Sequence, residues 1–101
     1  MIERHPSIPP THPGELLREI ILPDIDMTKT DIANALQISR QTLYDILNER
    51  QPVTPEMAVR FGKMFGNGPR FWINMQRVFD LAIAEKNIDV SAIPTLQSSH
   101  G

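Results

Sequence analysis

A short polar run near the middle of the chain has side chains suited to nucleic-acid contacts. Ser39, Arg40, Gln41 and Thr42 follow one another directly before the apolar Leu43. Arginine and glutamine can each make paired hydrogen bonds to a base edge in the major groove of DNA. Serine and threonine hydroxyls, together with the free N–H groups at a helix start, suit phosphate oxygens. This run is therefore a candidate for the base-reading end of a DNA-binding helix.

Two short helices joined by a tight turn are expected to present this run. We predict helices over residues 29–36 and 40–48, with Thr28 and Ser39 as their N-caps. A helix-turn-helix needs a small residue where the helices cross, which Ala33 supplies, and apolar residues at fixed offsets. Those apolar residues are Ile32, Leu36, Ile38, Leu43 and Ile46. The alternative interpretation is a plain helical hairpin whose polar residues face only water.

The turn between the two helices holds an unusual residue. The backbone there must be left-handed, a conformation that glycine adopts freely, but the chain has Gln37. A non-glycine residue in that conformation costs about 1 kcal/mol. We expect the packing of Leu36 and Ile38 on either side to hold it in place.

The candidate DNA-contacting residues lie in and around these helices. Arg40, Gln41 and Thr42 are expected to reach into the major groove, whereas Lys29 and Arg50 flank the motif and suit phosphates. The full set is Thr28, Lys29, Thr30, Ser39, Arg40, Gln41, Thr42, Tyr44, Asn48 and Arg50. Residues 40–77 hold six basic and three acidic residues, although the whole chain has a net charge of −2. This asymmetry fits a DNA-contacting face, and an ordinary mixture of surface charges is the alternative explanation.

Helical periodicity elsewhere in the chain predicts an all-α, five-helix bundle. Further helices are expected over residues 13–21, 55–65 and 69–86, each opened by a proline. With 101 residues, 41% of them hydrophobic, the chain suits one small domain. We place this helix-turn-helix domain at residues 12–87, between a proline-rich extended arm at 1–11 and a tail at 88–101. In the first and fourth helices, the residues expected to face the core are Leu16, Leu17, Ile20, Ile21, Met57, Ala58, Phe61 and Phe65.

The helix over residues 69–86 carries more apolar surface than a small core needs. Part of it is expected to pack against a second copy around a twofold axis. The candidate dimer residues are Trp72, Met75, Phe79 and Ile83. Phe79 and Ile83 are expected to lie beyond the reach of the shorter helices, whereas Trp72 has a second interpretation, closing the core against Phe61 and Phe65. The alternative for the whole helix is that it simply caps the core.

Enzymatic, metal-binding and membrane functions find no support in the sequence. The chain has no cysteine, and His5, His12 and His100 share no helix face at ligand spacing. The glycine-containing stretch at 66–68 lacks the lysine of a phosphate-binding loop. No apolar run approaches the ~20 residues of a membrane span, and the N-terminus lacks a signal-peptide core. We therefore expect a cytoplasmic protein without catalytic residues, metal or cofactor.

Four sequence motifs, in their order and spacing, resemble one family. They are His12-Pro13-Gly14-Glu15-Leu16-Leu17, Ile38-Ser39-Arg40-Gln41-Thr42-Leu43, Thr54-Pro55-Glu56-Met57-Ala58 and Phe71-Trp72-Ile73-Asn74-Met75-Gln76. Over residues 12–86 the chain is similar to the HigA antitoxins, also called VapI-like, of the Cro/repressor (XRE) helix-turn-helix superfamily. The family usually has glycine where this chain has Gln37, and often glutamine where it has Lys29.

The resemblance implies a lambda-repressor-like fold and two linked functions. It implies a homodimer that binds a palindromic double-stranded DNA operator and represses its own operon. It also implies neutralisation of a HigB toxin, a RelE-like mRNA endonuclease. Two other interpretations stay open, namely a solitary helix-turn-helix regulator without a toxin partner and a protein-interaction module that does not bind DNA.

Overall fold

The computed structural model describes residues 10–97, and within that range the chain forms helices and connecting segments without a β-strand. The elements are α1 (Pro13–Leu16), η1 (Leu17–Ile21), η2 (Leu22–Asp24), α2 (Lys29–Leu36), α3 (Arg40–Leu47), α4 (Pro55–Phe65) and α5 (Pro69–Asn87). The predicted all-α fold is confirmed, because α1, η1 and η2 together form the first of the five expected helical segments. Most of the predicted arm, residues 1–9, and the last four residues of the tail lie outside the described residues.

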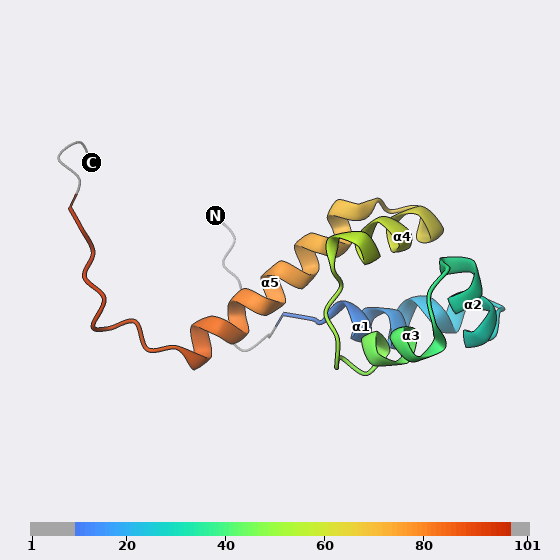
Figure 1. Cartoon of the computed structure of the whole chain (residues 1–101), viewed down its shortest axis with the longest axis horizontal. Coiled ribbons are helices and arrows are strands. Elements are labelled where there is room, and N and C mark those ends of the chain that lie inside the picture. Colours follow the sequence, from blue (N-terminus) through green and yellow to red (C-terminus); the bar gives the residue numbers. More distant parts are fainter. Residues whose placement is uncertain (1–9, 98–101) are drawn as a thin grey trace.

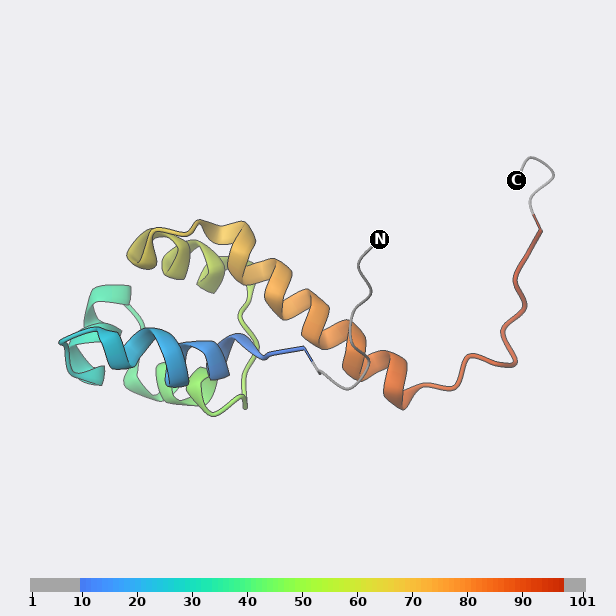
Figure 2. The same cartoon turned by 180° about the vertical axis from the view of Figure 1, so that it is seen from behind.

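The helices form two groups with the core between them. Figures 1 and 2 show α4 beside the first half of α5 in one group, and the first helical segment, α2 and α3 in the other. The second half of α5 projects beyond both groups, and the tail continues from its far end. The helix-turn-helix therefore lies at one end of the molecule, and the free end of α5 lies at the other.

The first helical segment changes its helix type, which corrects one predicted core residue. α1 passes into a π-helical stretch, η1, in which the N–H of Leu22 donates to the carbonyl of Leu17. Leu17 and Leu22, five residues apart, are both buried, whereas Ile20 is 60% exposed. The prediction that Ile20 faces the core is wrong, because a π-helix bonds residues five apart and shifts the inward face away from the α-helical stripe.

Aromatic rings from α4 and α5 fill the middle of the core. The ring of Trp72 lies 5.2 Å from that of Phe61 and 5.8 Å from that of Phe65. Its indole N–H donates to Asn67 Oδ1 at 2.7 Å, so the one polar atom of the side chain is satisfied. Trp72 is completely buried within the chain, which corrects its assignment to the dimer surface. The structure agrees with the second interpretation, in which Trp72 closes the core against Phe61 and Phe65.

Gln76 is a buried polar residue in the middle of α5 that the apolar pattern does not predict. Its Oε1 accepts a hydrogen bond from the N–H of Val53 at 2.8 Å, and its Nε2 donates to Asp80 at 2.9 Å. The amide therefore ties the connection before α4 to α5. Its burial is tolerated because both ends of the amide have partners.

His12 joins the start of the fold to the far half of α5. Its Nδ1 accepts the N–H of Gly14 at 2.8 Å and so caps α1. Its ring also meets the ring of Phe79 edge-on, with 4.9 Å between the centroids. The expectation that Phe79 lies beyond the reach of the shorter helices is therefore wrong, because the α1 cap extends to meet it.

Acid is expected to weaken the fold through His12. Burial lowers the pKa of its imidazole, with Glu49 and Asp80 acting in the opposite direction. The unfolded chain, with a histidine pKa near 6.5, then binds a proton before the folded chain does. The free energy of unfolding should therefore fall as the pH drops below about 6.5 and through the lower, folded-state pKa. Urea unfolding at neutral and mildly acidic pH measures this, and His12→Asn, which keeps a capping side chain but cannot titrate, should flatten the dependence. If the free energy of unfolding depended on pH equally in His12→Asn and in the unchanged protein, the role assigned to His12 would be contradicted.

Candidate nucleic-acid interface

Both ends of α2 are fixed by local hydrogen bonds. Thr28 Oγ1 accepts the N–H of Asp31 at 3.0 Å, which confirms Thr28 as the N-cap. Gln37 has a φ of 62°, so the predicted left-handed turn residue is confirmed. The N–H groups of Gln37 and Ile38 donate back to Asn34 and Ala33 at 3.1 and 3.0 Å. This paired pattern is the Schellman motif that glycine usually closes, here closed by glutamine.

Arg60 on α4 supports this turn from outside the motif. Its guanidinium donates to the carbonyls of Leu36 at 2.8 Å and Gln37 at 3.4 Å, and pairs with Glu56 at 3.0 Å. A cation at a helix C-terminus also favours the helix dipole. The sequence signal for this role was only a basic residue in a basic segment, which does not distinguish a structural arginine from a DNA-contacting one.

The start of α3 is capped in a way that leaves its first side chains free of the core. Ser39 Oγ accepts the N–H of Thr42 at 3.0 Å and donates to Thr42 Oγ1 at 2.9 Å. Ser39 is therefore confirmed as the N-cap, and Thr42 is half-buried beside it. Arg40 and Gln41 between them are exposed. The first turn of α3 thus presents an arginine, a glutamine and free backbone N–H groups on the surface.

The opposite side of α3 is held against the first helical segment. Leu43, Ile46 and Leu47 are buried. Gly14 packs so closely on α3 that a Cβ atom at this position would overlap the carbonyl oxygen of Ile46. Arg18 donates to the carbonyl of Leu47 at 2.5 Å and so satisfies the last turn of α3. These contacts fix the direction in which the exposed face points.

Gln41, Asp45 and Asn48 lie on one exposed side of α3, because residues four and three apart share a helix face. Gln41 Nε2 donates to Asp45 Oδ1 at 2.8 Å. Arg50 donates to the same oxygen at 3.1 Å. The sequence reasoning missed Asp45 as part of the interface, although its spacing of four residues from Gln41 was a usable signal.

The chain returns from the end of α3 through a second left-handed residue. Glu49 has a φ of 62°, and its N–H donates to Ile46 at 3.0 Å. The N–H of Arg50 donates to the carbonyl of Asp45 at 2.8 Å. This is again a Schellman motif, and it turns the Arg50 side chain back over Asp45.

All ten predicted DNA-contacting residues lie on the surface of the helix-turn-helix. Thr28, Lys29 and Thr30 are exposed at the start of α2, and Tyr44 is 40% exposed on α3. Arg50 and Gln41 already share a carboxylate partner within the chain, Asp45. The structure therefore offers the predicted set of side chains, with an acidic residue among them.

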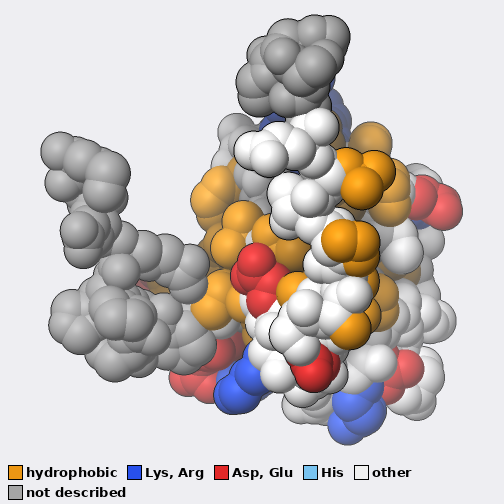
Figure 3. Space-filling model, turned by 90° about the vertical axis from the view of Figure 1, so that its left-hand side faces the viewer, with side chains coloured by type: hydrophobic (Ala, Val, Ile, Leu, Met, Phe, Trp, Pro, Cys, Tyr) orange, Lys and Arg blue, Asp and Glu red, His pale blue; other side chains and the backbone are white. Residues whose placement is uncertain are grey.

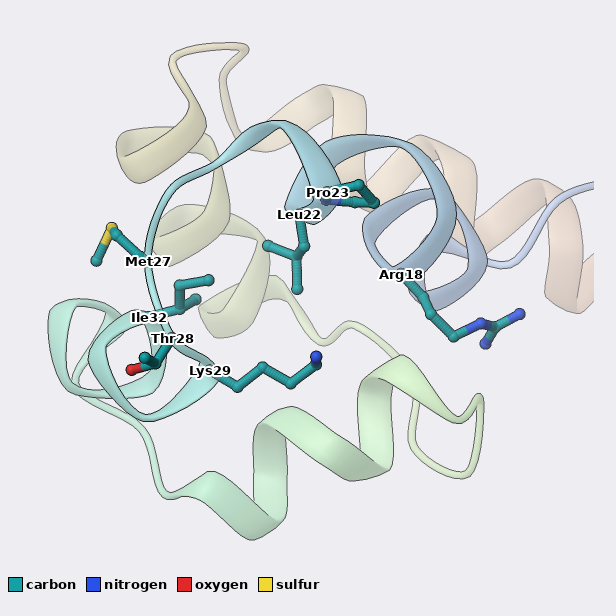
Figure 4. Close-up of a pocket in the computed structure, with 7 residues that line it drawn as sticks. All are labelled: Arg18, Leu22, Pro23, Met27, Thr28, Lys29 and Ile32. Atoms are coloured by element: carbon teal, nitrogen blue, oxygen red, sulfur yellow. The ribbon is translucent and has the colours of Figure 1, made fainter.

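A cleft of about 230 Å³ lies beside the start of α2. Its walls are Arg18, Leu22, Pro23, Met27, Thr28, Lys29 and Ile32. Figure 4 shows Arg18 and Lys29 extending toward the same side of this cleft from η1 and α2. Arg18 already binds the end of α3 and the carboxylates of Glu19 and Glu49, so Lys29 is the cation of this cleft for which a phosphate contact stays a prediction.

Two further classes of site find no structural counterpart in the described part of the chain. Residues 10–97 contain no cluster of three or more metal-ligating side chains. None of the helices in this range combines the length and apolar character that a membrane span requires.

The chain matches no protein-family model, but several known protein sequences resemble most of its length. It is 38% identical over 78 residues to an uncharacterized helix-turn-helix-type transcriptional regulator of Haemophilus influenzae, covering 77% of this chain and 73% of that protein. It is 31% identical over 72 residues to antitoxin HigA-1 of Vibrio cholerae, covering 71% of this chain and 68% of that protein.

Solved structures extend the likeness to three dimensions. The Pseudomonas aeruginosa antitoxin HigA, solved with the higBA promoter, is 36% identical with a TM-score of 0.76, covering 86% of this chain and 99% of that chain. Antitoxin GraA, in complex with its operator, is 31% identical with a TM-score of 0.82, covering 97% of this chain and 100% of that chain. The helix-turn-helix and the helices that hold it are therefore shared features.

Proposed function

This chain belongs to the HigA family of helix-turn-helix antitoxins, and on that premise we propose that it binds operator DNA, represses its own operon and neutralises a toxin in the cytoplasm. The observation that carries the DNA-binding part is the exposed, capped start of α3. Arg40 and Gln41 are exposed at the start of a helix whose other side is locked into the core. Such a helix can enter a major groove as a rigid reader.

The surface residues divide into two roles by their chemistry and position. Arg40 and Gln41 have the side chains that read guanine and adenine edges. Lys29, Thr28 and Ser39 lie at the starts of α2 and α3, where side chains and helix N–H groups suit phosphates. The first group then supplies sequence preference, and the second supplies register and affinity.

Gln41→Ala is the test of base reading. The variant should lose ~1–3 kcal/mol of binding free energy at the operator, because a bidentate base contact is removed. Binding to unrelated duplex should barely change. Mobility-shift titrations with the DNA upstream of the protein's own coding region, and with a random duplex of equal length, measure both.

Gln97→Ala is the matched control, because it removes the same side chain from the exposed tail. Its binding should equal that of the unchanged protein. Equal losses on both duplexes with Gln41→Ala would remove Gln41 from the base-reading set, and a parent protein that binds neither duplex would overturn the DNA-binding function.

The projecting end of α5 suits a twofold contact with a second copy. Val78, Leu81 and Ile83 are exposed there, and the tail adds Ile88, Val90, Ile93 and Leu96. Figure 3 looks at this end of the molecule and shows hydrophobic side chains spread across it.

We assign Met75, Phe79 and Ile83 to the dimer surface and leave Trp72 out. Apolar exposure of this extent on one end of a small domain is typical of an interaction surface. A dimer would place two copies of α3 about one DNA turn, ~34–36 Å, apart.

Ile83→Asp should give a folded monomer with weak operator binding. Ile83 is 44% exposed, so the change disturbs the contact between copies and leaves the core unchanged. Sedimentation measures the association state, and circular dichroism reports the helices. Ile20→Asp is the control, because it is the same substitution at an exposed isoleucine at the other end of the molecule. A dimer that survives Ile83→Asp would contradict the assigned surface.

A HigB-like toxin, an mRNA endonuclease similar to RelE, is the proposed protein partner. Membership of the antitoxin family supports this. Expression of the neighbouring gene alone should arrest growth of the host, and co-expression of this protein should restore it. A neighbouring gene without any effect on growth would favour a solitary regulator of transcription.

A further inference from the structure

Asp45 occupies an unexpected place for an acidic residue. It lies on the exposed side of α3 between Gln41 and Asn48, in the centre of the surface proposed to meet DNA. A carboxylate there faces a polyanion and opposes binding by charge repulsion. The residue nevertheless retains about a quarter of its side-chain exposure and binds two neighbours, so its charge is directed at specific groups.

The first of these neighbours is the proposed base reader. Gln41 Nε2 donates one of its two hydrogens to Asp45 Oδ1 at 2.8 Å. The amide then keeps its oxygen and its second hydrogen, which are the acceptor and donor that an adenine edge requires. A side chain already held in one orientation loses less conformational entropy when it binds.

The second neighbour is Arg50, which the sequence predicts to meet phosphates. Arg50 donates to the same Asp45 oxygen at 3.1 Å, and the left-handed turn at Glu49 brings it there. While this ion pair persists, the guanidinium is partly withdrawn from the phosphates of any duplex. The pair therefore lowers the affinity that comes from charge alone, which is the component shared by all DNA sequences.

We infer that Asp45 is a specificity-determining residue of this interface. Its carboxylate orients Gln41 for a base contact and restrains Arg50 from phosphates, so that operator DNA is favoured over unrelated DNA. On unrelated DNA, no base contact by Gln41 offsets the repulsion between Asp45 and the phosphates. On the operator, that base contact does offset it. This inference rests on the proposed DNA-binding function.

Asp45→Ala in the full chain tests the inference on operator and random duplexes. The variant should bind random duplex several-fold more tightly, with the slope of log K against log salt steeper by ~0.9, because the released Arg50 can neutralise one more phosphate. The ratio of operator to random affinity should fall by about tenfold, within the range that one bidentate base contact contributes. Asp45→Asn, which keeps an oxygen acceptor for Gln41 but not the charge, should retain part of that ratio.

Two controls separate this role from general effects. Glu85→Gln raises the net charge by the same amount on the distant half of α5, and it should leave the affinity ratio unchanged. Combining Asp45→Ala with Gln41→Ala should cost less discrimination than the two single changes added together, because Asp45 acts through Gln41.

The outcomes are distinct. Any of three results would overturn the role of Asp45. They are an unchanged ratio of operator to random affinity in Asp45→Ala, the same gain in random-duplex affinity in Glu85→Gln, and full additivity of Asp45→Ala with Gln41→Ala. Full additivity is also what a direct contact from Asp45 to a cytosine would give. If the unchanged protein fails to prefer its upstream DNA, the proposed function fails as well, whereas a preference that survives Asp45→Ala overturns only this inference.

Discussion

The contact of Gly14 with the carbonyl of Ile46 fixes α3 on the first helical segment, and the proposed function depends on this contact. α3 has eight residues, and isolated helices shorter than ~12–15 residues are marginal in water. Its helicity and direction must therefore come from packing. A side chain larger than hydrogen at position 14 would push the two segments apart, so the glycine determines where α3 can lie.

The same segment supplies the other restraints on α3. His12, two residues before Gly14, caps α1, and Arg18, one turn beyond Gly14, binds the carbonyl of Leu47 at the end of α3. The motif from His12 to Leu17 thus has a physical explanation. It combines a cap, a first-turn proline, a close-approach glycine and the buried Leu17, and together these hold the reading helix in place.

Arginine side chains have two different roles in this molecule, one structural and one at the DNA-contacting surface. The charge of the surrounding sequence does not distinguish the two. Arg18 and Arg60 satisfy carbonyls at the ends of α3 and α2, where orphan acceptors would otherwise need water. Arg40 is exposed at the start of α3, and Arg50 is paired with Asp45. The basic excess of residues 40–77 therefore includes the structural Arg60 and the already paired Arg50, and it overstates the charge available to DNA.

The sequence by itself determined the helices of the motif, their caps at Thr28 and Ser39, and the left-handed turn at Gln37. These features follow from local rules, because a cap or a turn involves residues only a few positions apart. Tertiary structure alone decided that Ile20 faces solvent, that Trp72 closes the core and that Phe79 meets His12. It also decided that Gln76 is buried between two elements. Those outcomes depend on a π-helical shift of phase and on side chains from separate elements meeting in space, and periodicity along a single helix carries no information about either.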